Sequence, residues 1–82
     1  MPRLGRPRNE VDQSTYSGRV AARLRRLREK SGKTVPEMAQ AVGVKTPTWY
    51  QYENGRIAVS LDLLPIISAT LRVSIRDILP ED

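Results

Sequence analysis

The chain has 82 residues, with 14 Lys and Arg against nine Asp and Glu, and it contains neither cysteine nor histidine. A chain of this length forms one small domain with little material for a catalytic cleft. Without Cys and His it lacks disulfides, thiolates, the usual zinc ligands and imidazole general bases, so we expect no enzyme, no cofactor and no metal.

Positive charge gathers in the first part of the chain. Residues 1–33 carry ten Lys or Arg and three Asp or Glu, whereas residues 34–82 carry four and six. This imbalance favours a polyanionic partner, nucleic acid first and an acidic membrane surface second. No apolar run approaches the ~20 residues that span a bilayer, and no signal-peptide core follows the basic start, which predicts a cytoplasmic, nucleoid-associated protein without a membrane partner.

Residues 1–16 are predicted to be a flexible basic arm ahead of a folded domain at residues 17–82. Their two prolines and scattered apolar residues bury too little surface to offset the entropy of ordering. Any contact that this arm makes with a nucleic acid would be made by Arg3, Arg6 and Arg8. Gly-Arg-Pro within this arm looks like the centre of an AT-hook, a minor-groove binder, but a loose arm on phosphates and a plain tail remain open.

The first helix is expected from Ser17, as N-cap, to Gly32. Val20, Leu24 and Leu27 form an apolar stripe on an otherwise arginine-rich segment. Glycine reaches the left-handed conformation that ends a helix, so this helix should stop there.

A second helix follows at once. Thr34 and Glu37 have the spacing of a capping box, and Pro36 fits a first turn, where a backbone donor is not needed. Gly43 can end this helix in a tight turn, and Val44 beyond it can fold back onto the core.

The third helix is TPTWYQYEN, at residues 46–54, with Thr46 as the expected N-cap because a residue before proline avoids the α region. At 100° per residue, Trp49, Tyr52 and Glu53 share one side, which we assign to the core. The opposite side carries Pro47, Tyr50, Gln51 and Asn54, whose polar groups suit base edges or phosphates. Two alternatives remain, namely a Trp49 that stacks on a base and a polar face that is merely solvated.

Two shorter helices complete the chain. Either Ser60 or Asp62 caps the fourth, and we favour Asp62 because Pro65 then falls in the first turn. SIRD, at residues 74–77, predicts a capping box for a last helix that Pro80 stops.

Residues 18–79 resemble the Cro/C1-type (lambda-repressor-like, XRE) helix-turn-helix family. The resemblance rests on EMAQAVGV at 37–44 and YENGR at 52–56. It implies an all-α, five-helix lambda-repressor-like domain with the helix-turn-helix at its second and third helices. It also implies double-stranded DNA as partner, helix three in the major groove, and a homodimer, for which Ile75 and Leu79 are candidate contacts.

The resemblance also implies contacts, carried over by position. The residues expected to contact DNA bases are Lys45, Thr46, Pro47 and Gln51. Those expected to contact the DNA backbone are Thr48, Tyr50, Asn54 and Arg56. The family pattern further pairs a helix-one arginine with the helix-three glutamate, here Arg28 with Glu53. Two departures stand out: Val35 replaces a polar phosphate-binding residue, and Pro47 replaces a polar base-reading one, so readout there is apolar or absent.

The main hypothesis is a sequence-specific transcriptional regulator, in particular a dimeric repressor. A phage repressor, a restriction-modification controller and an antitoxin are not separated by the sequence. One alternative is a protein-interaction module, antitoxin-like or polymerase-binding, for which DNA contact is secondary. Another is RNA binding through the arginines of helix one.

Overall fold

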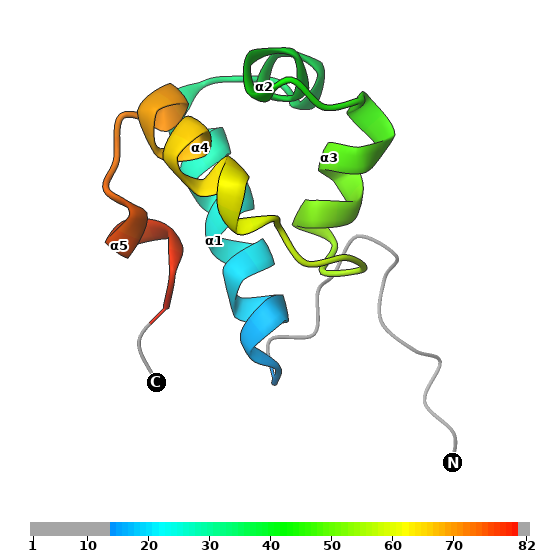
Figure 1. Ribbon diagram of the computed structural model, residues 1–82, viewed down its shortest axis with the longest axis vertical. Coiled ribbons are helices and arrows are strands. Elements are labelled where there is room, and N and C mark those ends of the chain that lie inside the picture. The colour runs from blue at the N-terminus through cyan, green and yellow to red at the C-terminus, as the bar shows by residue number, and fades with distance from the viewer. Residues whose placement is uncertain (1–13, 81–82) are drawn as a thin grey trace.

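The computed structural model describes residues 14–80, and within this range the chain forms helices and no strand (Figure 1). The predicted arm arginines, Arg3, Arg6 and Arg8, therefore lie outside the described residues. The five-helix, all-α prediction is confirmed. The elements are α1 (Tyr16–Ser31), α2 (Val35–Val42), α3 (Thr46–Glu53), the short 3-10 helix η1 (Leu61–Leu63), α4 (Leu64–Leu71) and α5 (Ile75–Ile78).

One apolar core joins all five helices. α1 lies at the centre, with α3 on one side of it, α5 on the other and α2 across one end (Figure 1). Each helix contributes one side chain with no exposed surface: Leu24, Met38, Trp49, Ile67 and Ile78. Burial of a large apolar side chain stabilises a fold by about 1.5–3 kcal/mol, so these contacts fix how the helices are arranged.

α1 begins two residues earlier than the sequence predicted. The N-cap is Thr15, whose Oγ1 accepts a hydrogen bond of 2.9 Å from the backbone N–H of Gly18. The expected cap, Ser17, is already helical, because the extended backbone that a cap requires falls at Thr15. The end of the helix was predicted correctly, since Gly32 adopts a φ of 81°.

α2 follows its predicted pattern closely. The Thr34 side chain accepts from the Glu37 N–H, and the Glu37 carboxylate accepts from the Thr34 N–H at 2.8 Å, which completes the capping box. Gly43 ends the helix with a φ of 89°.

The expected N-cap of α3 was wrong by one residue. Lys45 has the extended backbone of a cap, and Thr46 is the first helical residue. The penalty on a helical residue before Pro47 is offset by the first turn of the helix, where the Trp49 N–H donates to the Lys45 carbonyl at 3.1 Å. The predicted end at Asn54 is confirmed.

The start of α4 also differs from the prediction. Ser60 caps η1, accepting from the Asp62 N–H at 3.2 Å, and α4 begins at Leu64. Pro65 tolerates only the first turn of an α-helix, so the three residues before Leu64 use the tighter 3-10 pattern instead. The capping box of α5, Ser74 with Asp77, is confirmed. Among the helices of residues 14–80, none has the length and apolar character that crossing a membrane requires.

Candidate nucleic-acid interface

α2 and α3 form two helices joined by a tight turn. The N–H groups of Gly43 and Val44 both donate to the Ala39 carbonyl, at 2.8 and 3.0 Å, and close the end of α2. Val44 then packs against the core. The chain leaves this turn through Lys45 into α3, which descends along the side of the molecule (Figure 1).

The inner face of α3 is anchored in the core. Trp49 and Tyr52 are buried and meet edge to face, with ring centroids 5.8 Å apart and planes at 86°. The indole N–H of Trp49 donates to Oε2 of Glu53. Trp49 is therefore enclosed by the domain, and the alternative in which it stacks on a base is wrong.

Glu53 is also held from α1. Arg28 donates to Glu53 through Nε at 2.6 Å and through Nη2 at 3.2 Å, a two-pronged ion pair whose side chains are only 11% and 5% exposed. This hydrogen bond raises the pKa of Arg28. Nη1 of the same guanidinium donates to the Lys33 carbonyl at 2.8 Å, which ties the end of α1 to the segment before α2.

The outer face of α3 is polar and open. Among the predicted contact residues, the exposed ones are Lys45, Pro47, Tyr50, Gln51 and Arg56, and the half-buried ones are Thr46, Thr48 and Asn54. All eight lie on α3 or its immediate flanks, so the fold brings them together.

The charge of this segment is one-sided. Lys45 and Arg56 stand exposed at its two ends, and its one carboxylate, Glu53, is 4% exposed and paired with Arg28. The outer face therefore presents cations and hydrogen-bonding groups without a competing anion, which suits a polyanion.

Val35 departs from the family pattern for a structural reason. It is the first residue of α2 and belongs to the buried core, at 7% exposure. Its side chain adds to the interior and offers no polar group to a phosphate.

Fold and site together define a helix-turn-helix domain. The chain belongs to the helix-turn-helix domain family, whose model matches residues 19–78. Its helix-turn-helix domain is of the Cro/C1 (XRE) type, a class of DNA-binding domain found in transcription regulators.

Three known proteins are similar to this chain, two of them in sequence and the third in fold alone. The clp gene regulator ClgR from Corynebacterium glutamicum is 33% identical in two crystal structures, with TM-scores of 0.70 and 0.69; 73% of this chain aligns with 64% and 78% of theirs. TK0539 of Thermococcus kodakarensis, named an HTH-type transcriptional regulatory protein, is 52% identical over 40 residues, which are 49% of this chain and 13% of that protein.

The third comparison concerns the fold alone. NHTF from Neisseria, described as a hypothetical transcription factor, is 22% identical and aligns with 95% of this chain and 90% of its own at a TM-score of 0.76. The chain thus spans only part of the curated relative and about two thirds of one ClgR chain.

Proposed function

We propose that the chain is a sequence-specific repressor that binds double-stranded DNA as a homodimer, with α3 in the major groove. The observation that carries this proposal is the division of α3 into two faces. Trp49, Tyr52 and the carboxylate of Glu53 are fixed in the core, and the polar residues of the opposite face point away from it. A rigid helix of this width fits the major groove, where base pairs present distinct donor and acceptor patterns.

In this proposal, base edges are read from the first two turns of α3. Gln51 has the leading role, because its amide donates to and accepts from adenine at once. Lys45 and Thr46 offer further donors at the start of the helix. Pro47 offers only an apolar surface, which suits a thymine methyl group.

The flanking residues set the register on the duplex. Thr48 and Tyr50 lie beside the base-reading positions, and Asn54 and Arg56 follow the helix. Donors of this kind contact phosphate oxygens, which fix the position of the protein without reading sequence.

Repression requires only the proposed DNA-binding face of the domain. Occupancy of a promoter is sufficient to block transcription, whereas activation needs a second surface for the transcription machinery. The regulator ClgR, to which this chain is similar, is described as a gene regulator and carries no stated sign of regulation.

The test is selection of preferred sites from randomised duplex DNA at a salt concentration of about 0.15 M, where nonspecific phosphate binding is weak. A two-fold-symmetric site with half-site centres roughly ten base pairs apart is expected. Failure to enrich any sequence would contradict the proposal and favour a protein partner for the outer face of α3.

Gln51→Ala should then cost about 1–3 kcal/mol of binding free energy on the selected site and relax the preference at one position of each half-site. Gln40→Ala is the matched control, because it removes the same amide from an exposed position of α2. Fluorescence anisotropy with the selected duplex and with single-base variants of it measures both. Equal losses in the two variants would remove Gln51 from base reading.

A further inference from the structure

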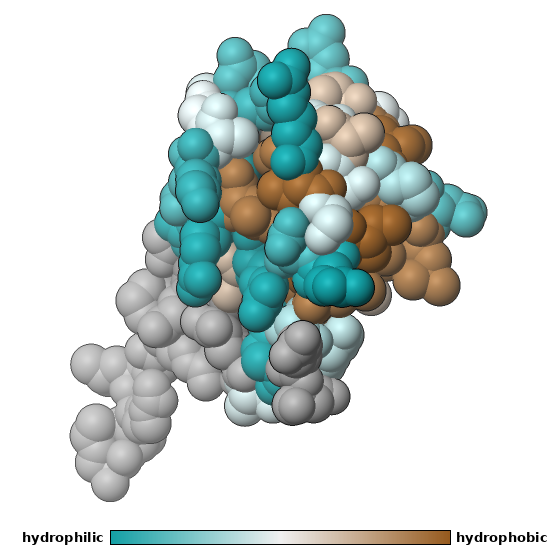
Figure 2. Space-filling view, turned by 90° about the vertical axis from the view of Figure 1, so that its left-hand side faces the viewer, coloured by the Kyte–Doolittle hydropathy of each residue, from teal (hydrophilic) through white to brown (hydrophobic). Residues whose placement is uncertain are grey.

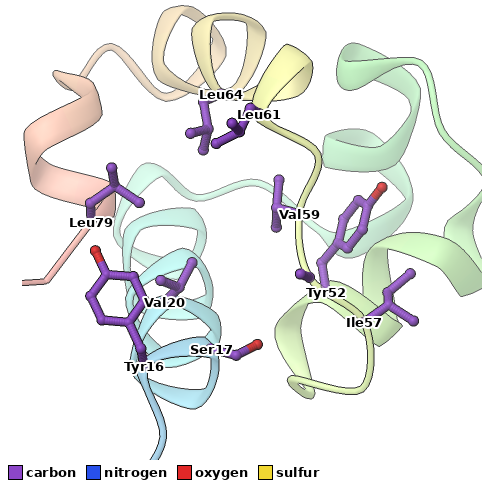
Figure 3. Close-up of a pocket in the computed structure, with 10 residues that line it drawn as sticks. Tyr16, Ser17, Val20, Tyr52, Ile57, Val59, Leu61, Leu64 and Leu79 are labelled. Atoms are coloured by element: carbon purple, nitrogen blue, oxygen red, sulfur yellow. The ribbon is translucent and has the colours of Figure 1, made fainter.

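An apolar groove lies beside the end of α3. It has a volume of about 360 Å³, and Figure 3 shows side chains from five parts of the chain that face it. Tyr16 and Val20 come from α1, Tyr52 from α3, Val59 from the loop after α3, Leu64 from α4, and Leu79 from the end of the chain.

The rim of this groove exposes large apolar side chains. Leu61 is 78% exposed, Tyr16 is 44% exposed and Ile57 is 40% exposed, and all three line the groove. Single exposed apolar residues are ordinary on a protein surface, but several around one hollow mark a site of association.

We infer that this groove is the surface on which a second copy of the chain docks, an inference that rests on the dimer in the proposed function. A two-fold dimer uses the same patch on both copies, so the patch must be complementary to itself. This patch has both a projection and a recess that could receive it, since the protruding Leu61 lies directly beside the groove. Leu61 of each copy enters the groove of the other.

The charges around the patch support the same occupant. The mainly apolar segment 57–61 is flanked by exposed Arg56 on one side and exposed Asp62 on the other. Two copies related by a two-fold axis run antiparallel across this segment, so the cation of one copy meets the anion of the other. A partner of unrelated sequence would need an anion and a cation at the same spacing to pair with Arg56 and Asp62.

The position of the groove suits a DNA-binding dimer. Tyr52, on the buried side of α3, lines the groove, and segment 57–61 follows shortly after α3. Docking at this groove would therefore bring the α3 helices of the two copies, which read the DNA in the proposed function, close to the two-fold axis. Apolar side chains also reach the surface on the face that carries α5 (Figure 2), where Ile75 is 36% exposed. That face lies across α1 from α3 (Figure 1) and would hold the recognition helices further apart.

The experiment is sedimentation velocity on the full chain without DNA, from micromolar to millimolar concentration. A small patch gives a weak dimer, so a reversible monomer-dimer equilibrium is expected in this range. Leu61→Lys should weaken the dimer at least tenfold without loss of folding, since the side chain is largely exposed. Ile75→Lys is the matched control and should leave the equilibrium unchanged. A chain that is monomeric throughout, or an Ile75→Lys variant that is weakened as much, would overturn the inference.

A charge exchange tests the pairing across the axis. Asp62→Arg should weaken the dimer, and the double variant Arg56→Asp, Asp62→Arg should restore it in the absence of DNA. Failure of the double variant to recover would contradict the antiparallel arrangement.

Site selection separates this inference from the proposed function. Selection with the Leu61→Lys variant should still enrich the sequence of a single half-site, but no longer two half-sites in two-fold-symmetric pairs. Retained pairing in that variant would place the dimer contact elsewhere, whereas no enrichment even with the unaltered chain would count against DNA reading itself.

Discussion

α2 and α3 are two helices of the same length that are stabilised in different ways. Each has eight residues and a proline in its first turn. α2 begins with a complete capping box and an acidic residue in its first turn, whereas Lys45 at the start of α3 makes no side-chain cap and no acidic residue follows in the first turn. α2 is thus stabilised from its own sequence, and α3 must be stabilised by contacts with the rest of the domain.

Those contacts are the buried ring pair and the ion pair on the inner face of α3. Trp49 and Tyr52 pack into the core, and Glu53 accepts hydrogen bonds from both Trp49 and Arg28. A cap carboxylate at the start of α3 would repel phosphates at the proposed interface. Anchoring the helix from its inner face keeps the end that approaches DNA free of negative charge.

The strongest way to break this arrangement is Arg28→Ala. It leaves the carboxylate of Glu53 buried without its cation, and loss of one partner of a buried pair costs about 3–5 kcal/mol. The low end of that range is expected, because the Trp49 N–H remains as a donor. Urea unfolding followed by tryptophan fluorescence measures the free energy of unfolding.

The matched control is Arg25→Ala on the same helix. Arg25 pairs with Glu29 at 3.3 Å, among its contacts, but the two side chains are 41% and 55% exposed, so the expected change is within about 0.5 kcal/mol. If the two alanine variants had the same stability, the inner-face pair would not be the anchor of α3.

Truncation of the two N-caps sharpens the comparison. Thr34→Ala should cost about 1 kcal/mol of unfolding free energy, because its side chain accepts from the Glu37 N–H. Lys45→Ala removes no cap bond and should leave that free energy almost unchanged.

DNA affinity should respond in the opposite order. Lys45→Ala should weaken binding to the selected site and lower its dependence on salt concentration, whereas Thr34→Ala should leave both unaltered in conditions where the domain is folded. Anisotropy titrations at two salt concentrations measure this. A loss of affinity in both variants would mean that the start of α3 is no more important for binding than that of α2.

The sequence predicted those features that depend on neighbouring residues. The capping boxes of α2 and α5 could be predicted because all their groups lie within four residues. The buried side of α3 could be predicted because helical periodicity places Trp49, Tyr52 and Glu53 together. The cap positions of α1 and α3 were wrong by one or two residues, since several polar residues compete and the path of the chain decides which is extended.

Other features depend on residues far apart in the sequence. Arg28 and Glu53 are 25 residues apart, and only the family resemblance suggested their contact. The groove beside α3 could not be predicted from a sequence pattern, because segment 57–60 is irregular and has no period that would separate half-buried Val59 from exposed Leu61. The outer face of α3 was predicted as a set of residues, and its role in DNA reading is a proposal.

The smallest expected effect concerns pH and α2 alone. Hydrogen bonds from the Thr34 backbone N–H and then from its side chain lower the pKa of Glu37 from its ordinary value of 4.5. A carboxyl with a lowered folded pKa stabilises the fold above its unfolded pKa, and this stabilisation is lost as pH falls through the folded value. Glu37→Gln keeps an oxygen acceptor for the Thr34 N–H but does not titrate.

The difference in unfolding midpoint between the original chain and Glu37→Gln should therefore be constant above about pH 5 and shrink at lower pH. Thermal unfolding by circular dichroism at several pH values measures it, and the other carboxyls cancel because both proteins contain them. Parallel midpoints down to pH 3 would mean that the capping box of α2 acts through its geometry alone. α3, whose first turn has no carboxylate, would then differ from α2 in hydrogen bonding and not in charge.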